Sequence, residues 1–247
     1  MNPAAYLEMA ETESRHWWFS GRRAILSSMI ASLKLPQNPK ILEIGCGTGG
    51  NLEMLGKFGN VSALEMDATA RTIASKKTSN LYNIRAGHCP DEIPFHDQRF
   101  DLICMFDVLE HIEQDTETLI AIKQLLKKNG RVLITVPAYQ WLYGAHDEFL
   151  HHKRRYSAEQ LRQIIAVAGL QPAKISYFNT FLFPLAVVVR IKDKLLGNSS
   201  ATGTSVPPSP INRFFRTLFG AERYLLERFN LPFGTSLLCV LKTADEC

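Results

Sequence analysis

A glycine-rich turn between a short apolar run and a helical stretch is the feature that most constrains the fold of this chain. Residues 41–50 read Ile-Leu-Glu-Ile-Gly-Cys-Gly-Thr-Gly-Gly. Glycines at a strand-to-helix turn let the backbone approach a ligand closely, and the first turn of the helix presents unpaired N–H groups. Gly45, Gly47 and Gly50 satisfy the dinucleotide pattern G-x-G-x-x-G, which alone is weak evidence. The turn is therefore predicted to hold a ligand.

The acid just before the turn discriminates between ligands. Glu43 ends the apolar run, where its charge would lie beside the phosphates of a dinucleotide, which is unfavourable. The same carboxylate suits a ligand that carries an ammonium group and a sulfonium. A Rossmann oxidoreductase that uses NAD remains an alternative, although the region after the fourth predicted strand lacks a Tyr-x-x-x-Lys pattern.

Short apolar runs alternate with helical stretches along the chain. The apolar runs predict strands at 40–44, 61–65, 83–86, 100–106, 130–136, 174–178 and 236–242. The helical stretches are 5–34, one from about 51, one through 77, 116–127 and 158–168. This alternation indicates β-α-β units and a parallel sheet, and the continuous apolar character of the strands fits a sheet covered on both faces.

Three motifs occur in the order found in the class I S-adenosylmethionine (SAM)-dependent methyltransferases, which the chain resembles. They are LEIGCGTG at 42–49, FDLICMFDVLEH at 100–111 after Pro94-Phe95, and NGRVLITVP at 129–137. The resemblance covers about residues 40–178 and the last strand. Glu110-His111, and a Trp-Trp pair before an arginine, point to the quinone-biosynthesis-like branch of small-molecule and lipid methyltransferases.

The resemblance implies an α/β fold of Rossmann-like type. The family sheet has seven strands and is mostly parallel, with an antiparallel last strand and helices on both faces. We expect an N-terminal helical cap at 1–39 and a SAM-binding domain formed by 40–178 and 235–247. A helical insert or cap at 179–234 would precede the last strand.

The resemblance also implies SAM as cofactor, with S-adenosylhomocysteine as product. Glu43 would lie near the amino group, Glu65 would bind both ribose hydroxyls, and Arg22 would hold the methionine carboxylate. His88 stands where the family offers an aspartate to the adenine; His88 or a backbone carbonyl would replace that contact. The predicted cofactor-binding residues are Arg22, Glu43, Gly45, Cys46, Gly47, Gly49, Glu65, Met66, His88, Phe106, Asp107 and His111.

An aromatic- and histidine-rich segment, 138–156, follows the fifth strand at the edge where ligands of this fold bind. His146 and His151 are the predicted general bases, because an oxygen or nitrogen nucleophile must lose a proton. The alternative is that these side chains have a structural role and fix the conformation of the segment by hydrogen bonds. No metal site is predicted, because neither H-x-x-x-H nor H-x-H spacing occurs. The predicted substrate-binding residues are Tyr139, Trp141, Tyr143, Arg155 and Tyr156.

Residues 179–234 are more basic than the rest of the chain. They hold seven Lys/Arg against three Asp/Glu, an excess equal to the net charge of +4 of all 247 residues. An apolar run of about 12 residues, too short to span a membrane, and an amphipathic stretch at 211–229 flank a Gly/Ser/Thr/Pro-rich linker at 197–210. We expect the insert to cap the acceptor site and to contact an anionic bilayer peripherally, with an ordinary helical lid or a dimer face as the alternative.

Composition sets broader limits. A chain that is 46% hydrophobic and 21% charged is not disordered, and a net charge of +4 without a broad basic tract does not indicate a nucleic-acid partner. The five cysteines form no C-x-x-C pair, which makes a disulfide framework or a structural zinc site unexpected. The acidic N-terminus lacks an apolar signal region. A cytoplasmic protein is predicted, with a peripheral position on the inner face of the membrane as a further expectation; the sequence does not indicate the oligomeric state.

The leading functional prediction is a SAM-dependent methyltransferase that acts on oxygen or nitrogen of a small-molecule or lipid-linked acceptor. The NAD-type oxidoreductase is one alternative. A non-catalytic protein with a SAM-binding fold is the other, because a fold does not guarantee an activity.

Overall fold

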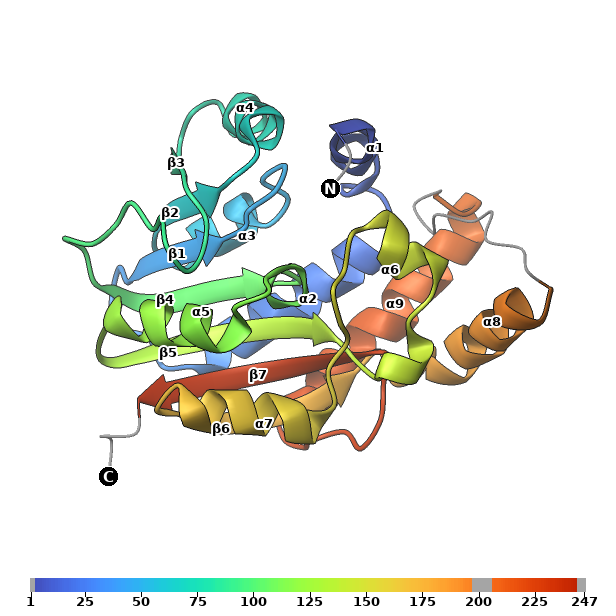
Figure 1. Cartoon of the computed structure of the whole chain (residues 1–247). Helices are drawn as coiled ribbons and strands as arrows, with labels where there is room; N and C mark the ends of the chain where they lie inside the picture. Colours follow the sequence, from blue (N-terminus) through green and yellow to red (C-terminus); the bar gives the residue numbers. More distant parts are fainter. Residues whose placement is uncertain (1–2, 197–205, 244–247) are drawn as a thin grey trace.

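The computed structural model describes residues 3–196 and 206–243, and these form an α/β fold around one sheet (Figure 1). In the described part of the chain the sheet has seven strands, in the order β3-β2-β1-β4-β5-β7-β6. Strand β7 is antiparallel to both of its neighbours, β5 and β6, whereas the other neighbouring pairs of this sheet are parallel. The predicted fold class is thereby confirmed. The strands are β1 (Lys40–Ile44), β2 (Asn60–Glu65), β3 (Asn83–Ala86), β4 (Phe100–Phe106), β5 (Leu126–Pro137), β6 (Leu170–Phe178) and β7 (Ser236–Thr243).

Helices cover both faces of the sheet, with α5 and α7 on one face and α2 and α9 on the other (Figure 1). The helices between the N-terminus and β5 are α1 (Pro3–Thr12), α2 (Trp17–Ser32), α3 (Leu52–Gly56), α4 (Ala68–Lys77), the 3-10 turn η1 (Leu109–His111) and α5 (Asp115–Gln124). Those after β5 are the 3-10 turn η2 (Gln140–Leu142), α6 (Ala145–Phe149), α7 (Ala158–Val167), α8 (Phe183–Leu196) and α9 (Ser209–Leu226).

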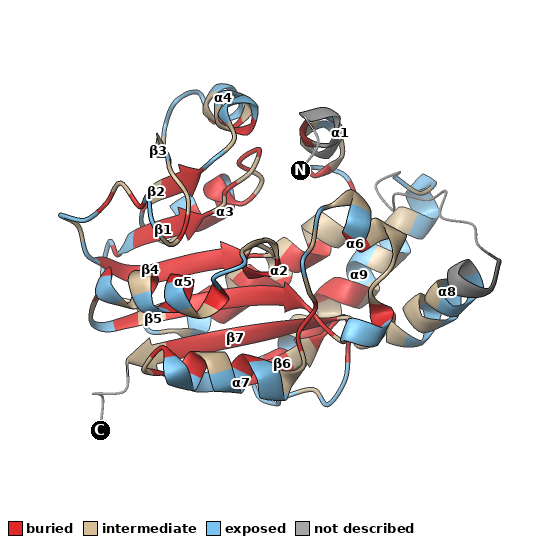
Figure 2. Ribbon diagram, viewed as in Figure 1, coloured by how far each residue is buried: buried red, intermediate tan, exposed pale blue. Residues whose placement is uncertain are grey.

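The central strands are apolar throughout because neither of their faces meets water. All seven residues of β4 are buried (Figure 2). Ile103 belongs to the apolar cluster that includes α5 and α7, whereas its neighbour Leu102 belongs to the cluster that includes α2 and α9. Successive strand residues point to opposite faces, so one strand supplies both cores.

The second half of the insert is part of one of these two layers. Trp18 of α2 stacks on Phe219 of α9, with ring centroids 4.9 Å apart and planes 9° from parallel. A Cβ added to Gly21 would lie 2.6 Å from the Phe219 ring, so α2 needs a glycine where α9 crosses it. Helix α9 therefore packs against the sheet together with α2.

Several segments differ from the sequence prediction. Strand β6 begins at Leu170 rather than at 174, because Leu170 already pairs with Thr243 of β7. The stretch 5–34 forms two helices, because the chain turns at 13–16 and His16 caps α2 by accepting a hydrogen bond from the backbone N–H of Trp18 (3.2 Å). Strand β5 begins four residues earlier than expected, since Leu126 pairs with Phe100. The segment 138–156 contains η2 and α6 rather than a continuous loop. Residues 197–205 of the predicted linker lie outside the described residues.

Among residues 3–196 and 206–243, no helix combines the length and the apolar character needed to cross a membrane.

A buried carboxylate joins α9 to the end of β6. Glu222 is 0% exposed and accepts hydrogen bonds from the backbone N–H groups of Asn179 (2.6 Å) and Phe181 (2.9 Å). Burial raises its pKa. Replacing this side chain by alanine would leave two buried donors unsatisfied and a cavity.

We therefore expect Glu222→Ala to lower the free energy of unfolding by about 2–4 kcal/mol. Exposed Arg228, on the turn after α9, offers a control, and Arg228→Ala should change stability by less than about 0.5 kcal/mol. Urea unfolding followed by circular dichroism measures both. Equal stability of the two variants would show that Glu222 does not anchor the insert.

Candidate functional site

The turn after β1 requires glycine because its backbone adopts positive φ angles and because neighbouring side chains leave no room for a Cβ at Gly45. Gly45, Gly47 and Gly49 have φ of 67°, 53° and 81°, a region that side chains with a Cβ rarely adopt. A Cβ on Gly45 would also lie 2.6 Å from Val108, which follows β4. By contrast, among the described residues nothing beyond its chain neighbours lies within 4 Å of a Cβ built on Gly47, so the backbone there borders open space. The turn is therefore packed tightly at Gly45 and leaves space beside Gly47.

Glu43, the fourth residue of β1, is buried next to this turn with one oxygen unsatisfied. The side chain is 1% exposed, and Oε1 accepts a hydrogen bond from Asn51 Nδ2 (2.9 Å). Oε2 accepts none from any residue that the structure describes. Burial raises the pKa of Glu43 to about 8, although the Asn51 hydrogen bond and the charge of Arg22 partly offset it. A cationic ligand group would satisfy this oxygen and favour the ionised carboxylate.

Arg22 reaches the same region from α2. Its Nη1 forms an ion pair with Asp107, which follows β4 at φ 56° and also accepts a hydrogen bond from Thr135 Oγ1 (3.0 Å). The Nε of Arg22 has no acceptor among the described residues. Burial lowers the pKa of Arg22 to about 10. The structure thus joins two of the predicted cofactor-binding residues and leaves the Nε donor of Arg22 for a ligand.

Glu65 is the last residue of β2 and hydrogen-bonds to the backbone of the glycine turn. Its Oε2 accepts the backbone N–H of Gly47 (2.9 Å), and its Oε1 accepts that of Asp67 (2.9 Å). Each carboxylate oxygen has a further lone pair, so a hydroxyl can still donate to it. Met66 beside it is 72% exposed.

The other predicted cofactor residues differ in burial. Cys46 and Phe106 are 5% and 6% exposed. His88 lies after β3, with Nδ1 3.3 Å from Glu92 Oε2.

The N-terminal segment lies over the glycine turn. Glu13 is 4% exposed, and its Oε1 accepts hydrogen bonds from Thr48 Oγ1 (2.7 Å) and Lys77 Nζ (2.5 Å). A Cβ on Gly50 would overlap the Glu13 carboxylate. Tyr6 of α1 is buried as well, and burial together with Glu65 and Asp67 raises its pKa to about 12. A pyrophosphate at this turn would lie beside the Glu13 carboxylate and would oppose ionisation of Glu43, which disfavours a dinucleotide.

A second polar cluster lies after β4, where Glu110 and His111 of η1 meet His152. The ligand-type atoms of these three residues lie within 4.8 Å of one another. Glu110 is 0% exposed, and neither of its oxygens has a hydrogen-bond partner among the described residues. The His152 Nε2 lies 3.8 Å from Glu110 Oε1, and the two histidine rings meet edge to face with centroids 4.7 Å apart.

Burial is the main influence on the charges of this cluster. It raises the pKa of Glu110 to about 8, although the charges of Arg22 and Arg155 offset part of the effect. Burial and the neighbouring His152 lower the pKa of His111 to about 4. The cluster therefore presents neutral imidazole nitrogen near a carboxyl group that has lost its hydration.

Asp147 of α6 fixes the orientation of the His152 ring in this cluster. It is fully buried, accepts a hydrogen bond from His152 Nδ1 (2.8 Å), and binds Arg155 through Nε–Oδ1 (2.8 Å) and Nη2–Oδ2 (3.0 Å). Burial alone would raise the pKa of Asp147, but the hydrogen bonds from His152 and Arg155 outweigh it and hold the pKa below its ordinary value. The backbone N–H of Lys153 donates to the carbonyl of Glu110 (2.9 Å), which ties the two segments together.

The predicted acceptor residues separate into two groups. Arg155, Tyr143 and Tyr156 make internal hydrogen bonds: Tyr143 Oη donates to the carbonyl of His152 (2.7 Å), and Tyr156 Oη donates to Asp115 Oδ2 (2.9 Å). Tyr139 and Trp141 instead join an aromatic group, their ring centroids 5.6 Å apart. Tyr139 also stacks on Tyr177 at 5.1 Å, and further members are Phe183 and Phe233.

The predicted general bases lie outside the cluster of acid and imidazole groups. His146 is half-buried in α6, and the side chain of His151 is exposed, at φ 58°. His152, which sequence reasoning did not select, is the histidine brought to Glu110 and His111. The one sequence feature that could have indicated His152 is its spacing of five residues from Asp147. No sequence feature near Glu13 indicates that it contacts the glycine turn.

The family pattern described as "Methyltransferase domain" matches residues 18–175. Among curated proteins, the mitochondrial ubiquinone biosynthesis O-methyltransferase of Schizosaccharomyces pombe is 31% identical over 104 residues, which are 39% of this chain and 37% of that protein. The aligned part therefore spans well under half of that relative.

Solved structures agree on the fold. A SAM-dependent methyltransferase from Clostridium acetobutylicum superposes with a TM-score of 0.58 at 12% identity and covers 90% of each chain. The [4+2]-cyclase SpnF gives a TM-score of 0.58 at 15% identity and covers 89% of this chain and 81% of its own. Such likeness shows the fold alone, because one of the two is named as a cyclase.

The contact between Glu13 and the turn is testable through Gly50. In Gly50→Ala the added Cβ would displace the Glu13 carboxylate and break its bonds to Thr48 and Lys77. We expect hydrogen exchange of the backbone at 10–16 to accelerate about tenfold, the loss of roughly 1.4 kcal/mol of local stability.

Gly144→Ala is the matched control, because a Cβ there meets only Arg190 Nη1, at 3.6 Å. Exchange at 10–16 should be unchanged in this variant. Equal exchange in the wild type and Gly50→Ala would show that Glu13 does not hold the segment.

Proposed function

The chain belongs to the methyltransferase-domain family, and from that premise we propose that it transfers the methyl group of SAM to an oxygen or nitrogen of a small-molecule or lipid-linked acceptor. The observation that carries the proposal is the unsatisfied oxygen of buried Glu43 beside an accessible glycine turn. A buried carboxylate of this kind favours a cationic ligand over an anionic one.

The residues present fit SAM as cofactor. Glu43 Oε2 would accept from the ammonium group, and Glu65 would accept from the ribose hydroxyls in addition to its two backbone donors. The free Nε of Arg22 would donate to the carboxylate end. When bound, the sulfonium supplies an activated methyl group; the chain itself has to hold, orient and dehydrate the reactants.

The chain contributes to methyl transfer mainly by position. The segment with Tyr6 and Glu13 covers the turn and would keep water from the reacting centre. The cluster of Glu110, His111 and His152 follows β4 at the edge of the sheet where ligands bind, and would receive the nucleophilic group of the acceptor. In this proposal His152 replaces His146 and His151 as the histidine nearest the reaction.

A phenolic acceptor fits the aromatic group that contains Tyr139 and Trp141. If the acceptor meets this group, its flat rings would favour a flat or isoprenoid molecule by burying apolar surface. The relative from Schizosaccharomyces pombe is named for an O-methylation in ubiquinone biosynthesis, which supports an aromatic hydroxyl as nucleophile. We propose a quinone-like or phenolic acceptor on this basis.

The competing functions are weaker. The carboxylates of Glu43 and Glu13 disfavour the pyrophosphate of NAD. A non-catalytic binding protein would have no need of the polar cluster after β4, and detection of S-adenosylhomocysteine with any acceptor would exclude it.

The charge at position 43 provides the test of the cofactor site. We expect SAM to bind the wild type and Glu43→Gln to bind SAM at least about tenfold more weakly, because the amide cannot neutralise an ammonium group. Glu53→Gln, which removes an exposed acid from α3, should bind SAM as the wild type does. Isothermal titration calorimetry measures all three. Binding of NAD in place of SAM would refute the proposal.

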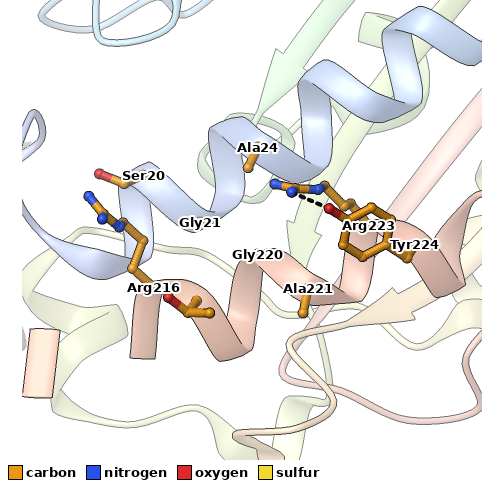
Figure 3. A pocket seen from close by; sticks show the side chains of 9 residues that line it. Ser20, Gly21, Ala24, Arg216, Gly220, Ala221, Arg223 and Tyr224 are labelled. Atoms are coloured by element: carbon orange, nitrogen blue, oxygen red, sulfur yellow. Dashed lines mark hydrogen bonds between the residues drawn. The ribbon is translucent and has the colours of Figure 1, made fainter. Parts of the chain in front are cut away.

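We also propose a peripheral membrane contact through the insert, which would bring a lipid-linked acceptor to the site. Helix α8 exposes a row of apolar side chains; Leu185 is 50% and Val188 is 62% exposed. Helix α9 carries cations at its surface: exposed Arg216 and half-buried Arg223 flank a pocket of about 330 Å³ between α2 and α9 (Figure 3). Arg223 Nη2 donates to Tyr224 Oη (2.6 Å). Apolar and basic surface together suit an anionic bilayer. Such a location would agree with a cytoplasmic protein that works on the inner face of the membrane.

Acidic substitution on α8 tests this contact. We expect Leu185→Glu/Val188→Glu to reduce cosedimentation with vesicles of phosphatidylcholine and phosphatidylglycerol about tenfold, through lost apolar insertion and added repulsion. Leu81→Glu/Val167→Glu adds the same charge at two exposed apolar positions elsewhere and should bind as the wild type does. Equal binding by both double variants, or none by the wild type, would end the membrane proposal.

A further inference from the structure

We propose that Glu110, His111 and His152 bind one divalent transition-metal ion of the Zn²⁺ class. Two imidazole nitrogens and a carboxylate oxygen are a common ligand set for such an ion when a further position is left for a substrate oxygen. All three ligand atoms lie within 4.8 Å of one another. The His152 Nε2 to Glu110 Oε1 distance, 3.8 Å, is close to the separation of about 3.4 Å that bonds of about 2.0–2.2 Å give in a tetrahedral site.

The lack of hydrogen-bond partners for the Glu110 carboxyl oxygens is an independent indication of a ligand. A carboxyl group with 0% exposure and no hydrogen-bond partner among the described residues is costly, because its hydration is lost without replacement. The two arginines whose charges act on Glu110 are already paired, Arg22 with Asp107 and Arg155 with Asp147. A bound cation would give the Glu110 carboxylate the partner that it lacks among the described residues.

Each histidine is oriented with one ring nitrogen occupied and the other available. The Nδ1 of His152 is fixed by Asp147 (2.8 Å), and Asp147 is in turn held by two bonds from Arg155. The ring of His111 hydrogen-bonds to the backbone of His151. Metal-ligating histidines are typically held in this way, by a carboxylate or a backbone carbonyl on the nitrogen that faces away from the ion.

The spacing explains why sequence patterns missed this site. Adjacent Glu110 and His111 come from a 3-10 turn, and His152 arrives from a segment 41 residues later, after β5 and α6. Recognition patterns such as H-x-x-x-H describe ligands on one helix, whereas these ligands meet only through the pairing of β4 with β5.

The role of the ion rests on the proposed methyl transfer. A hydroxyl oxygen of the acceptor would occupy the open coordination position, and the ion would lower the pKa of that hydroxyl so that its proton leaves to water. The resulting oxyanion would form the new O–C bond to the methyl group as the C–S bond breaks, and that electron pair remains on the sulfur of S-adenosylhomocysteine. Cation binding itself requires only the three ligands.

The experiment measures Zn²⁺ binding to untagged full-length protein that has been treated with a chelator. Competition against a chromophoric chelator should show one tight Zn²⁺ site in the wild type. Glu110→Gln and His152→Gln should weaken it by about a hundredfold or more, and Asp147→Asn by about tenfold to a hundredfold. His96→Gln removes an exposed histidine elsewhere and should bind as the wild type does. Mg²⁺, which prefers oxygen ligands, should not compete.

A measurement on the wild type keeps the proposal testable if a variant fails to fold, which circular dichroism would reveal. X-ray absorption of the zinc-loaded protein should show two imidazoles and oxygen ligands without sulfur. Absence of a stoichiometric site, sulfur in the coordination sphere, or equal affinity in folded Glu110→Gln would overturn the proposal. Zinc binding without SAM binding would instead refute the proposed function and leave the metal site standing.

Discussion

Burial of two carboxyl groups at the carboxyl edge of the sheet is the constraint on which the site depends. Glu43 and Glu110 are each at most 1% exposed, and each keeps at least one oxygen unsatisfied among the described residues. Carboxyl groups in this state raise the free energy of the fold unless cations or hydrogen-bond donors reach them. The nearby cation, Arg22, is shared with Asp107. The edge is therefore arranged to gain stability when positively charged ligands bind.

Helix α2 connects this edge to the insert. Arg22 reaches Asp107 from one side of the helix, while Trp18 and Gly21, within the same two turns, contact Phe219 of α9. A shift of α9 therefore alters the packing of the helix that carries Arg22. A movement of α9 would therefore reach the proposed cofactor site through α2, because packed helices move as units rather than deform.

The sequence predicted the strands, the glycine turn and Glu43, because these depend on local patterns: apolar runs, positive φ and the order of residues along one strand. It did not predict that Glu13 would contact the turn, because that contact joins residues 35 positions apart through the bend at 13–16. His152 was missed for a similar reason. Its importance comes from Glu110 and Asp147, which the fold brings together and which no periodicity marks.

The proton balance of SAM binding tests the central claim about Glu43 most directly. The pKa of about 8 means that the free carboxyl is mostly protonated at about pH 6.5, and a cationic ligand would lower that pKa and release the proton. Calorimetry in buffers of different ionisation enthalpy should therefore give about one proton released per SAM bound, and none in Glu43→Gln. SAM binding of equal affinity and equal proton balance in both proteins would contradict the account.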